Sequence, residues 1–297
     1  MSNLTNHSRK YGYYPGCSLH STSPEYDASF KAVCECLGIE LIEVNNWICC
    51  GASSAHSVSH LLAAALPIKN LALAENTGFN ELAVPCAKCF SRLKMALFET
   101  GQNPKLHDAV MEVIESPFQN NIKVIHPLEI FDKLSPEFIK ETVTRNLSGL
   151  KLVCYYGCLL TRPPKAMAFD VHEYPTSMDR ILEKVGATVL DWSYKTDCCG
   201  TAFALMGETD VVLTLTQKIL EHALAVGADA IAVACPLCHA NLDMRQKETE
   251  AKYQTDYEIP ILYFTQLMGL AFGIGPQKLE LTKHFVSPEP VLDALSL

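Results

Sequence analysis

The chain contains 297 residues, 48% of them hydrophobic and 19% charged, and carries a formal net charge of −9. This acidic balance disfavours a protein that binds nucleic-acid phosphates, and the longest apolar runs fall short of the roughly 20 residues of a membrane-spanning helix. Residues 1–10 lack the charged and then apolar pattern of a signal peptide. We therefore expect a cytoplasmic protein without a membrane span, long enough for two domains of about 150 residues each.

Short runs of β-branched and aromatic residues alternate with helix-like patterns along the whole chain. In the first half we expect strands at 11–17, 39–44, 81–85 and 122–127. Helices are expected near 25–37 and 54–76, a further helix is expected to begin at about residue 89, and short helices are expected after the last strand, up to about residue 146. The order recurs in the second half, with strands at 150–156, 187–192, 230–234 and 260–264 and helices near 177–186, 208–226 and from about residue 239. This alternation predicts an α/β fold made of two pseudo-symmetric, Rossmann-like parallel-sheet domains, at residues 1–148 and 149–297.

An internal repeat picks out the cysteines. The motif Cys49-Cys50-Gly51 recurs 149 positions later as Cys198-Cys199-Gly200, and in each half a CxxC motif follows after 35 intervening residues. Upstream, GYYPGC and YYGC align Cys17 with Cys158. Each half therefore carries five recurring cysteines, whereas Cys34, Cys36 and Cys154 have no counterpart and are expected to be small buried hydrophobic residues.

The recurring cysteines share a structural position. Each follows a predicted strand and precedes a predicted helix, at the carboxyl edge of a parallel sheet, where open α/β folds place their sites. The N-termini of helices at this edge favour thiolates and a negatively charged cofactor. We expect the three cysteine-bearing loops of each half to form one pocket, and the two pockets to face each other.

Several kinds of chemistry use clustered cysteines. A disulfide between adjacent cysteines would be strained, because neighbouring Cα atoms lie about 3.8 Å apart and a relaxed disulfide needs roughly 4.4–6.8 Å. A structural zinc ion takes four ligands and leaves one cysteine of each set unused, and a thioredoxin-like dithiol uses only the CxxC pair. An iron–sulfur cluster accommodates the whole set, since several irons need several thiolates, and it is the favoured interpretation.

With the spacings C-x31-CC-x35-CxxC and C-x39-CC-x35-CxxC, the sequence resembles the CCG-domain family, and within it the catalytic B subunits of heterodisulfide reductases. The resemblance extends from about Tyr11 to Gly275. It implies that each half is a CCG domain with one noncubane 4Fe-4S cluster at the carboxyl edge of its sheet. The implied ligands are Cys17, Cys49, Cys50, Cys86 and Cys89 for the first cluster and Cys158, Cys198, Cys199, Cys235 and Cys238 for the second.

The resemblance also implies an oxidoreductase acting on sulfur groups. Such a protein cleaves a small disulfide reductively between its two clusters, or oxidises thiols in the reverse direction. Its partners would be the ferredoxin-like C subunit and the flavin-containing A subunit of a heterodisulfide reductase-type complex. The alternative is a non-catalytic protein that relays electrons to a flavoprotein or quinone module.

Some residues other than cysteine lie close to the implied ligands. Four such residues lie within four positions of an implied ligand: His20, Lys88, Arg162 and His239. They could orient an anionic thiol substrate or deliver protons. A place at the rim of the site or in a contact with a partner protein is the commoner role of such residues. Trp47 and Trp192 are nearly equivalent in the repeat and are expected to shield the clusters. His56 and His60, four positions apart, are expected to pack locally or to meet solvent, because no third ligand accompanies them.

Overall fold

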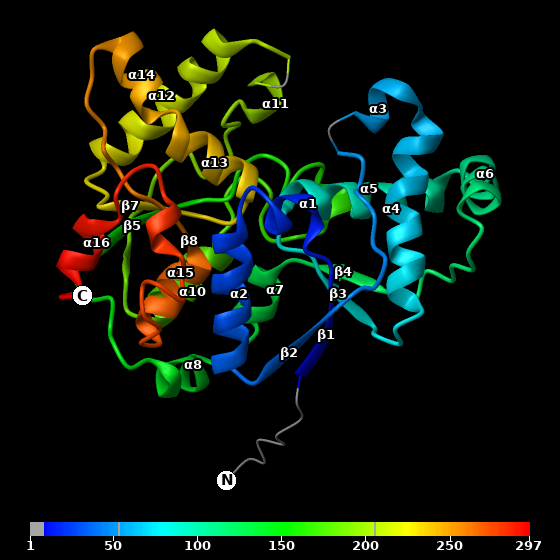
Figure 1. Cartoon of the computed structure of the whole chain (residues 1–297), viewed down its shortest axis with the longest axis horizontal. Coiled ribbons are helices and arrows are strands. Elements are labelled where there is room, and N and C mark those ends of the chain that lie inside the picture. Colours follow the sequence, from blue (N-terminus) through cyan, green and yellow to red (C-terminus); the bar gives the residue numbers. More distant parts are fainter. Residues whose placement is uncertain (1–8, 53, 205) are drawn as a thin grey trace.

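The computed structural model describes residues 9–297 except Ser53 and Leu205. It contains two four-stranded parallel sheets with helices packed around them (Figure 1). The first sheet has the order β2-β1-β3-β4 and the second has the order β6-β5-β7-β8. Their strands are β1 (Arg9–Tyr13), β2 (Ile39–Glu43), β3 (Glu81–Ala83) and β4 (Lys123–Ile125), and β5 (Lys151–Tyr155), β6 (Thr188–Val189), β7 (Ala230–Val233) and β8 (Ile261–Tyr263). The shared strand order confirms the predicted α/β fold with a duplicated parallel sheet.

Helices connect the strands of each sheet. Those of the first half are α1 (Gly16–His20), α2 (Pro24–Cys36), α3 (Ala55–Val58), α4 (His60–Glu75), α5 (Ala87–Gln102), α6 (Pro104–Ile114), α7 (Pro127–Asp132) and α8 (Pro136–Thr142). Those of the second half are α9 (Pro164–Met167), α10 (Ser177–Lys184), α11 (Thr201–Ala204), α12 (Thr209–Ala225), α13 (Pro236–Met244), α14 (Gln246–Tyr253), α15 (Phe264–Ala271), the 3₁₀ helix η1 (Leu281–Lys283) and α16 (Glu289–Ala294). The predicted domain boundary near residue 148 falls between β4 and β5, and its position stays a prediction.

Three local details differ from the sequence-based expectation. The long helix predicted at 54–76 is divided into α3 and α4 at Ser59, where the backbone is extended (φ −163°, ψ 136°) and the hydroxyl accepts a hydrogen bond from the Leu62 N–H. The helices at the CxxC motifs begin at Ala87 and Pro236, so the second cysteine of each motif lies in a first turn. Cys17 lies in the short helix α1 rather than at a strand end.

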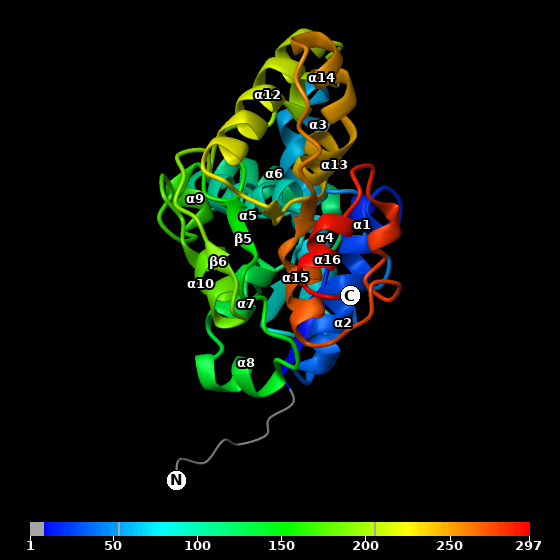
Figure 2. The same cartoon turned by 90° about the vertical axis from the view of Figure 1, so that its left-hand side faces the viewer.

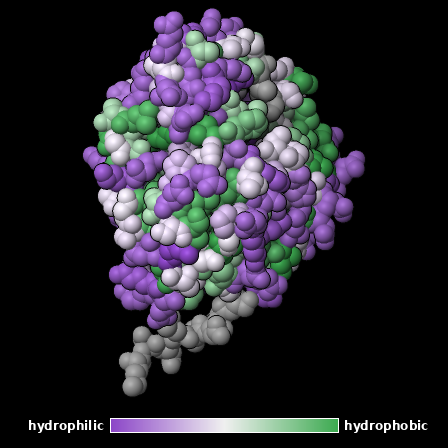
Figure 3. Space-filling view, turned by 60° about the vertical axis from the view of Figure 1, so that its left-hand side comes forward, coloured by the Kyte–Doolittle hydropathy of each residue, from purple (hydrophilic) through white to green (hydrophobic). Residues whose placement is uncertain are grey.

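Burial differs between the strands, and β2, at the edge of the first sheet, is only partly buried. Every residue of β7 and β8 is buried, as expected for parallel strands with helices on both faces. The molecular face in Figure 3 is mostly hydrophilic, with apolar residues in small groups. Within the described ranges, none of the helices combines the length and the apolar character needed to cross a bilayer.

The two halves pack together through two equivalent pairs of helices, each pair made of one helix from either half. Helix α2 packs on α15, and α10, the counterpart of α2, packs on α7, the counterpart of α15; Figures 1 and 2 both show α2 beside α15. In this contact the rings of Tyr26 and Tyr263 stack at 4.2 Å, and the hydroxyls of Ser29 and Thr265 are 2.7 Å apart. Because these groups are buried, the contact holds the carboxyl edges of the two sheets in a fixed arrangement.

Candidate metal centres

The five predicted ligands of the second half line one cavity. Its wall includes Cys158, Cys198, Cys199, Cys235, Cys238 and the side chain of Lys88, which comes from α5 of the first half. The Sγ atoms of Cys199 and Cys238 lie 3.7 Å apart, and the Gly200 N–H donates to the Sγ of Cys198 at 3.4 Å. Three loops that are far apart in the sequence therefore bring five sulfur atoms to one place.

The first half repeats this geometry. The Sγ atoms of Cys50 and Cys89 lie 3.3 Å apart, and the Gly51 N–H donates to the Sγ of Cys49 at 3.4 Å. Hydrogen bonding to Cys50 and burial raise the pKa of the Cys49 thiol, and the charge of Cys17 adds to them. Cys17 and Cys49 are exposed, whereas Cys50 and the CxxC cysteines are buried.

A tyrosine lies among the cysteines of each half. The Tyr14 hydroxyl donates to the carbonyl of Ile48 at 2.8 Å, and the Tyr155 hydroxyl donates to the carbonyl of Asp197 at 2.6 Å. Each acceptor immediately precedes an adjacent-cysteine pair. Burial, followed by the negative charge of neighbouring cysteines, raises the pKa of both hydroxyls, so they remain proton donors. The tyrosines thus fix the loops that carry Cys49 and Cys198.

Glycine is required where α1 and its counterpart approach the CxxC motif. Gly16 has φ +68° and Gly157 has φ +71°, a left-handed conformation that other residues rarely adopt. A Cβ atom at Gly16 would lie 2.9 Å from the Sγ of Cys89, and one at Gly157 would lie 2.9 Å from the Sγ of Cys238. These glycines keep side-chain atoms away from the two sulfur atoms, which leaves room for a metal group bound to them.

The CxxC loops of the two sites approach each other. Hydrogen bonding to Cys238, and then to Cys86, lowers the pKa of Cys235 well below its usual value. Beside this contact lies His126, which is fully buried. Its Nδ1 accepts the Leu128 N–H at 3.2 Å, which places the ring proton on Nε2.

The Nε2–H of His126 binds both CxxC loops at once. Its acceptors are the carbonyl of Pro85 at 2.9 Å and the carbonyl of Ala234 at 3.2 Å, the residues that precede Cys86 and Cys235. Burial lowers the pKa of His126 to about 4, so the ring is neutral near pH 7. One side chain therefore connects the two candidate sites, and no motif in the sequence indicated this role.

The electrostatics of both sites favour thiolates. Hydrogen bonding with Cys49 and Cys89 lowers the pKa of Cys50 to about 3, and hydrogen bonding with Cys158 lowers the pKa of Cys198 to about 6. The pKa values of the partner thiols Cys49, Cys89 and Cys158 are raised, because each retains its proton beside a neighbouring thiolate. Thiolate is the form of cysteine that binds metals. The donor set, soft and partly ionised, fits an iron–sulfur cluster in each half.

The four predicted residues other than cysteine have different surroundings. Lys88 lines the second cavity. His20 is at the rim of the first site, where its Nε2 is 3.1 Å from a Glu43 carboxylate oxygen and its ring meets Trp47 edge-on. Arg162 binds the Thr196 carbonyl at 3.1 Å and the Glu173 carboxylate at 2.8 Å.

His239 is directed away from the cluster cavity. It is buried, its ring stacks on Tyr263, and its Nε2 lies 3.0 Å from the Ile261 carbonyl and 3.1 Å from Nδ1 of His284. It lines a separate cavity together with Asp243. The structure thus gives Lys88 the most direct access to a molecule bound at the second site.

The remaining sequence predictions concern aromatic and unpaired residues. Trp47 contacts Tyr14 and Trp192 contacts Tyr155, so each indole packs beside the tyrosine of its site. His60 is exposed and lies 3.2 Å from Glu99. Cys34 and Cys154 are buried as predicted, but the prediction was wrong for Cys36, which α2 exposes in its last turn.

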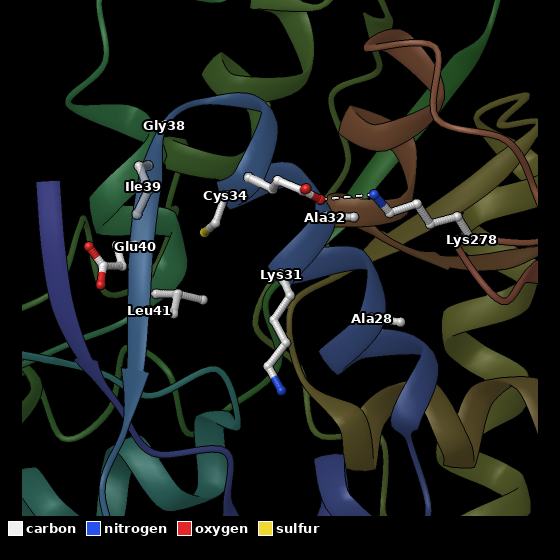
Figure 4. Close-up of a pocket in the computed structure, with 10 residues that line it drawn as sticks. Ala28, Lys31, Ala32, Cys34, Gly38, Ile39, Glu40, Leu41 and Lys278 are labelled. Atoms are coloured by element: carbon white, nitrogen blue, oxygen red, sulfur yellow. Dashed lines mark hydrogen bonds and ion pairs between the residues drawn. The ribbon is translucent and has the colours of Figure 1, made fainter. Parts of the chain in front are cut away.

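A larger cavity, of about 600 Å³, lies apart from both sites. It is an open groove between α2 and the edge strand β2 (Figure 4), and none of the ten recurring cysteines lines it. Cys34 points into it, and an ion pair between Glu35 and Lys278, at 2.8 Å, lies at its side. Its size alone therefore does not identify the functional site, because the chemistry-bearing residues lie elsewhere.

Arg92 is a site residue that the sequence reasoning missed. It follows Cys89 by one helical turn, and the Sγ of Cys89 lies 3.3 Å from the Sγ of Cys50. The repeat could have pointed to it, because the equivalent residue in the second half is Asn241 and the charge is therefore not duplicated.

Known proteins share this sequence pattern and fold. The family model of the CCG cysteine-rich domain matches residues 11–94 and 152–243. The chain is 30% identical to the 8-methylmenaquinol:fumarate reductase membrane anchor subunit of Wolinella succinogenes, over 94% of this chain and 97% of that protein. It is 29% identical to the B subunit of the ferredoxin/F(420)H(2)-dependent CoB-CoM heterodisulfide reductase of Methanosarcina acetivorans, over 93% and 94% of the two chains.

A solved structure shows a similar fold. The crystal structure of a hypothetical protein from Helicobacter pylori superposes with a TM-score of 0.74 at 15% identity and covers 95% of this chain. The match spans 53% of that longer chain, so it supports the fold alone. The resemblance to the B subunits of heterodisulfide reductases is confirmed by the relatives above. From the two matched segments and the relatives that align over nearly its full length, the chain belongs to the CCG cysteine-rich domain family.

Proposed function

We propose that this chain is the iron–sulfur subunit of a heterodisulfide reductase-like complex that cleaves a small disulfide between two noncubane 4Fe-4S clusters, or oxidises thiols in reverse. The observation that carries the proposal is the approach of two equivalent five-cysteine sites, whose CxxC loops share the His126 imidazole as a hydrogen-bond donor at Pro85 and Ala234. A disulfide has two sulfur atoms, and two adjacent sites can act on both.

The residues that would hold the clusters are the two sets of five cysteines. The first set is Cys17, Cys49, Cys50, Cys86 and Cys89, and the second is Cys158, Cys198, Cys199, Cys235 and Cys238. When bound, each cluster supplies one-electron transfer and a metal site with affinity for sulfur. Gly16 and Gly157 keep side-chain atoms away from the cysteine sulfurs, and Tyr14 and Tyr155 hold the adjacent-cysteine loops in place.

The overall reaction balances as RS–SR′ + 2e⁻ + 2H⁺ → RSH + R′SH. The S–S bond breaks, each sulfur gains one electron and one proton, and the electrons come from a one-electron donor. The donor would be a ferredoxin-like C subunit, itself reduced through a flavin-containing A subunit. Lys88 supplies a cation at the second cavity for an anionic group of the substrate.

A second candidate function is electron relay without disulfide chemistry. It is favoured by the relative from Wolinella succinogenes, whose name is that of a membrane anchor subunit of a quinol:fumarate reductase. The two functions differ in their response to sulfur compounds. Adding thiols or a disulfide to the oxidised protein changes the EPR spectrum of a disulfide-reducing protein and leaves that of a relay protein unchanged.

The proposal is tested by anaerobic iron and sulfide analysis of the purified chain. Cys50→Ser and Cys199→Ser are each expected to lose close to half of the iron and sulfide, since each removes a ligand from one site. Cys154→Ser, which changes a buried cysteine outside both sets, is the matched control and is expected to keep the full content. Full metal content in both ligand variants, or one zinc per site, would overturn the proposal.

A further inference from the structure

We propose that the guanidinium of Arg92 raises the reduction potential of the metal group in the first site, and that the second site has no equivalent charge at this position. The inference rests on the proposed function, because it assumes a redox-active group held by Cys50 and its neighbours. It makes the two halves of a duplicated fold electronically different.

Arg92 is held beside the first site by α5. The helix begins at the CxxC motif and places Arg92 one turn after Cys89. Its Nη2 donates to the Ala63 carbonyl of α4 at 3.1 Å, and its Nε is buried without a hydrogen-bond partner among the described residues. Glu99, the acidic residue that acts on Arg92 electrostatically, has its carboxylate 3.2 Å from His60 instead. Among the described residues no ion pair cancels the charge of Arg92, and the helix holds it one turn from Cys89.

Arg92 and Cys89 lie on the same face of α5, because residues three positions apart on a helix are neighbours. The Sγ of Cys89 lies 3.3 Å from the Sγ of Cys50, so the charge lies beside two of the proposed ligands. Burial lowers the pKa of Arg92 itself, although a guanidinium remains charged at any physiological pH. A half-buried charge is screened less by salt than an exposed one.

The equivalent position in the second half is neutral. Asn241 follows Cys238 by the same interval on α13, and its amide donates to the Cys199 carbonyl at 2.8 Å and to the Thr216 hydroxyl at 3.1 Å. Asn241 thus binds the adjacent-cysteine loop of its half directly, whereas Arg92 binds α4 and brings a charge. Only the charged one alters the electrostatic potential at its site.

Other cations near the sites have different roles. Arg162 is half exposed and is paired with Glu173, so its charge is neutralised. Lys88 lies on the cavity wall of the second site, where a substrate would contact it. Arg92 acts through the metal group and not on the substrate, and it is therefore a positioning residue whose effect appears in a reduction potential.

The direction of the effect follows from charge. Reduction adds a negative charge to the metal group, and a nearby positive charge stabilises the reduced form. Removing the charge should therefore make reduction of one group harder, by roughly tenfold in the one-electron equilibrium, which is a shift of about 59 mV to more negative potential. The other group should be unaffected.

The experiment is a redox titration of the iron-loaded protein followed by EPR. Arg92→Gln is expected to shift one of two transitions to lower potential, and Arg92→Lys is expected to restore it. Lys105→Gln removes the same charge from the exposed surface of α6 and is expected to shift neither. Glu99 opposes Arg92 electrostatically, so Glu99→Gln is expected to shift the same transition to higher potential.

The outcomes separate the two proposals. If the wild-type chain binds no iron, the proposed function fails and this inference fails with it. If iron is present and neither Arg92→Gln nor Glu99→Gln moves a transition, the inference is overturned while the proposed function stands. If Arg92→Gln does not retain iron, the opposite shift expected for Glu99→Gln decides the matter.

Discussion

The imidazole of His126 donates a hydrogen bond to the carbonyl of Ala234, 3.2 Å away and 108 positions later in the sequence. Because the same N–H also binds the Pro85 carbonyl, His126→Leu leaves two buried acceptors short of a donor. We expect a loss of about 2 kcal/mol in the free energy of unfolding. Anaerobic denaturant unfolding measures it, with His107→Leu, a partly exposed histidine of α6, as the control. Equal stability of the two variants would show that His126 only fills space.

The neutral state of His126 also predicts a dependence of stability on pH. Its pKa in the folded protein is about 4, below the usual value near 6.5, so the unfolded chain binds more protons between these values. Stability should therefore fall as the pH is lowered from 7 to 5, with about 2 kcal/mol of the loss coming from His126.

Other buried groups titrate in the same range, so the contribution of His126 must be isolated. His284 also has a pKa lowered to about 4 by burial and acts in the same direction. Burial raises the pKa values of Glu25 and Asp243, which acts in the opposite direction. The measurement is the difference in unfolding free energy between wild type and His126→Leu at pH 7 and pH 5. A difference that does not shrink on acidification would contradict a neutral His126.

The duplicated arrangement of cysteines could be predicted from the sequence because spacing survives duplication. The interval from Cys50 to Cys86 equals that from Cys199 to Cys235, and the strand patterns around both pairs match. His126 could not be found in this way, since its partners are main-chain carbonyls whose positions depend on packing between the halves. Its counterpart at the end of the last strand is Tyr263, a residue that stacks with Tyr26 instead.

Polar residues near a ligand in sequence were a weaker guide than the cysteines. His239 follows Cys238 directly, but the helical turn directs it to the Ile261 carbonyl, whereas Lys88 crosses to the other half. Side-chain direction on a helix changes by about 100° per residue, so adjacency in sequence does not place two side chains in one cavity. The division of the predicted helix 54–76 at Ser59 was also missed, because it depends on an extended backbone that the pattern of apolar residues did not indicate.

The hydroxyls of Tyr14 and Tyr155 should contribute equally to the two sites. Tyr14→Phe and Tyr155→Phe each remove one hydrogen bond to the residue before an adjacent-cysteine pair. We expect each to lower the free energy of unfolding by about 1 kcal/mol and to speed the loss of iron from one site. The measurement is the rate of iron release to a chelator. Tyr11→Phe, at a partly buried tyrosine of β1, is the control, and equal release rates in all three variants would contradict a role for these hydroxyls.

Lys88→Gln should weaken binding of an anionic disulfide. The side chain lines the second cavity but holds no cysteine in place, so we expect a KM raised roughly tenfold with kcat nearly unchanged. A charge interaction also predicts that added salt weakens substrate binding in the wild type more than in the variant. Steady-state kinetics at two ionic strengths measure both effects. A drop in kcat without a change in KM would assign Lys88 to the chemical step instead.

Gly16 and Gly157 provide the sharpest test of how closely the chain approaches the cysteine sulfurs. An alanine at either position adopts a left-handed backbone at a cost of about 1–2 kcal/mol and brings its Cβ to within 2.9 Å of Cys89 or Cys238. Gly38 has a similar φ of +64° with nothing within 4 Å of an added Cβ, so Gly38→Ala carries the backbone cost alone. We expect all three variants to lose stability, but only Gly16→Ala and Gly157→Ala to lose iron, each from one site. Measuring the iron and sulfide content together with the free energy of unfolding separates the cost of the left-handed backbone from the cost of crowding the sulfur atom. Full metal content in Gly16→Ala and Gly157→Ala would show that the sulfur atoms can move aside.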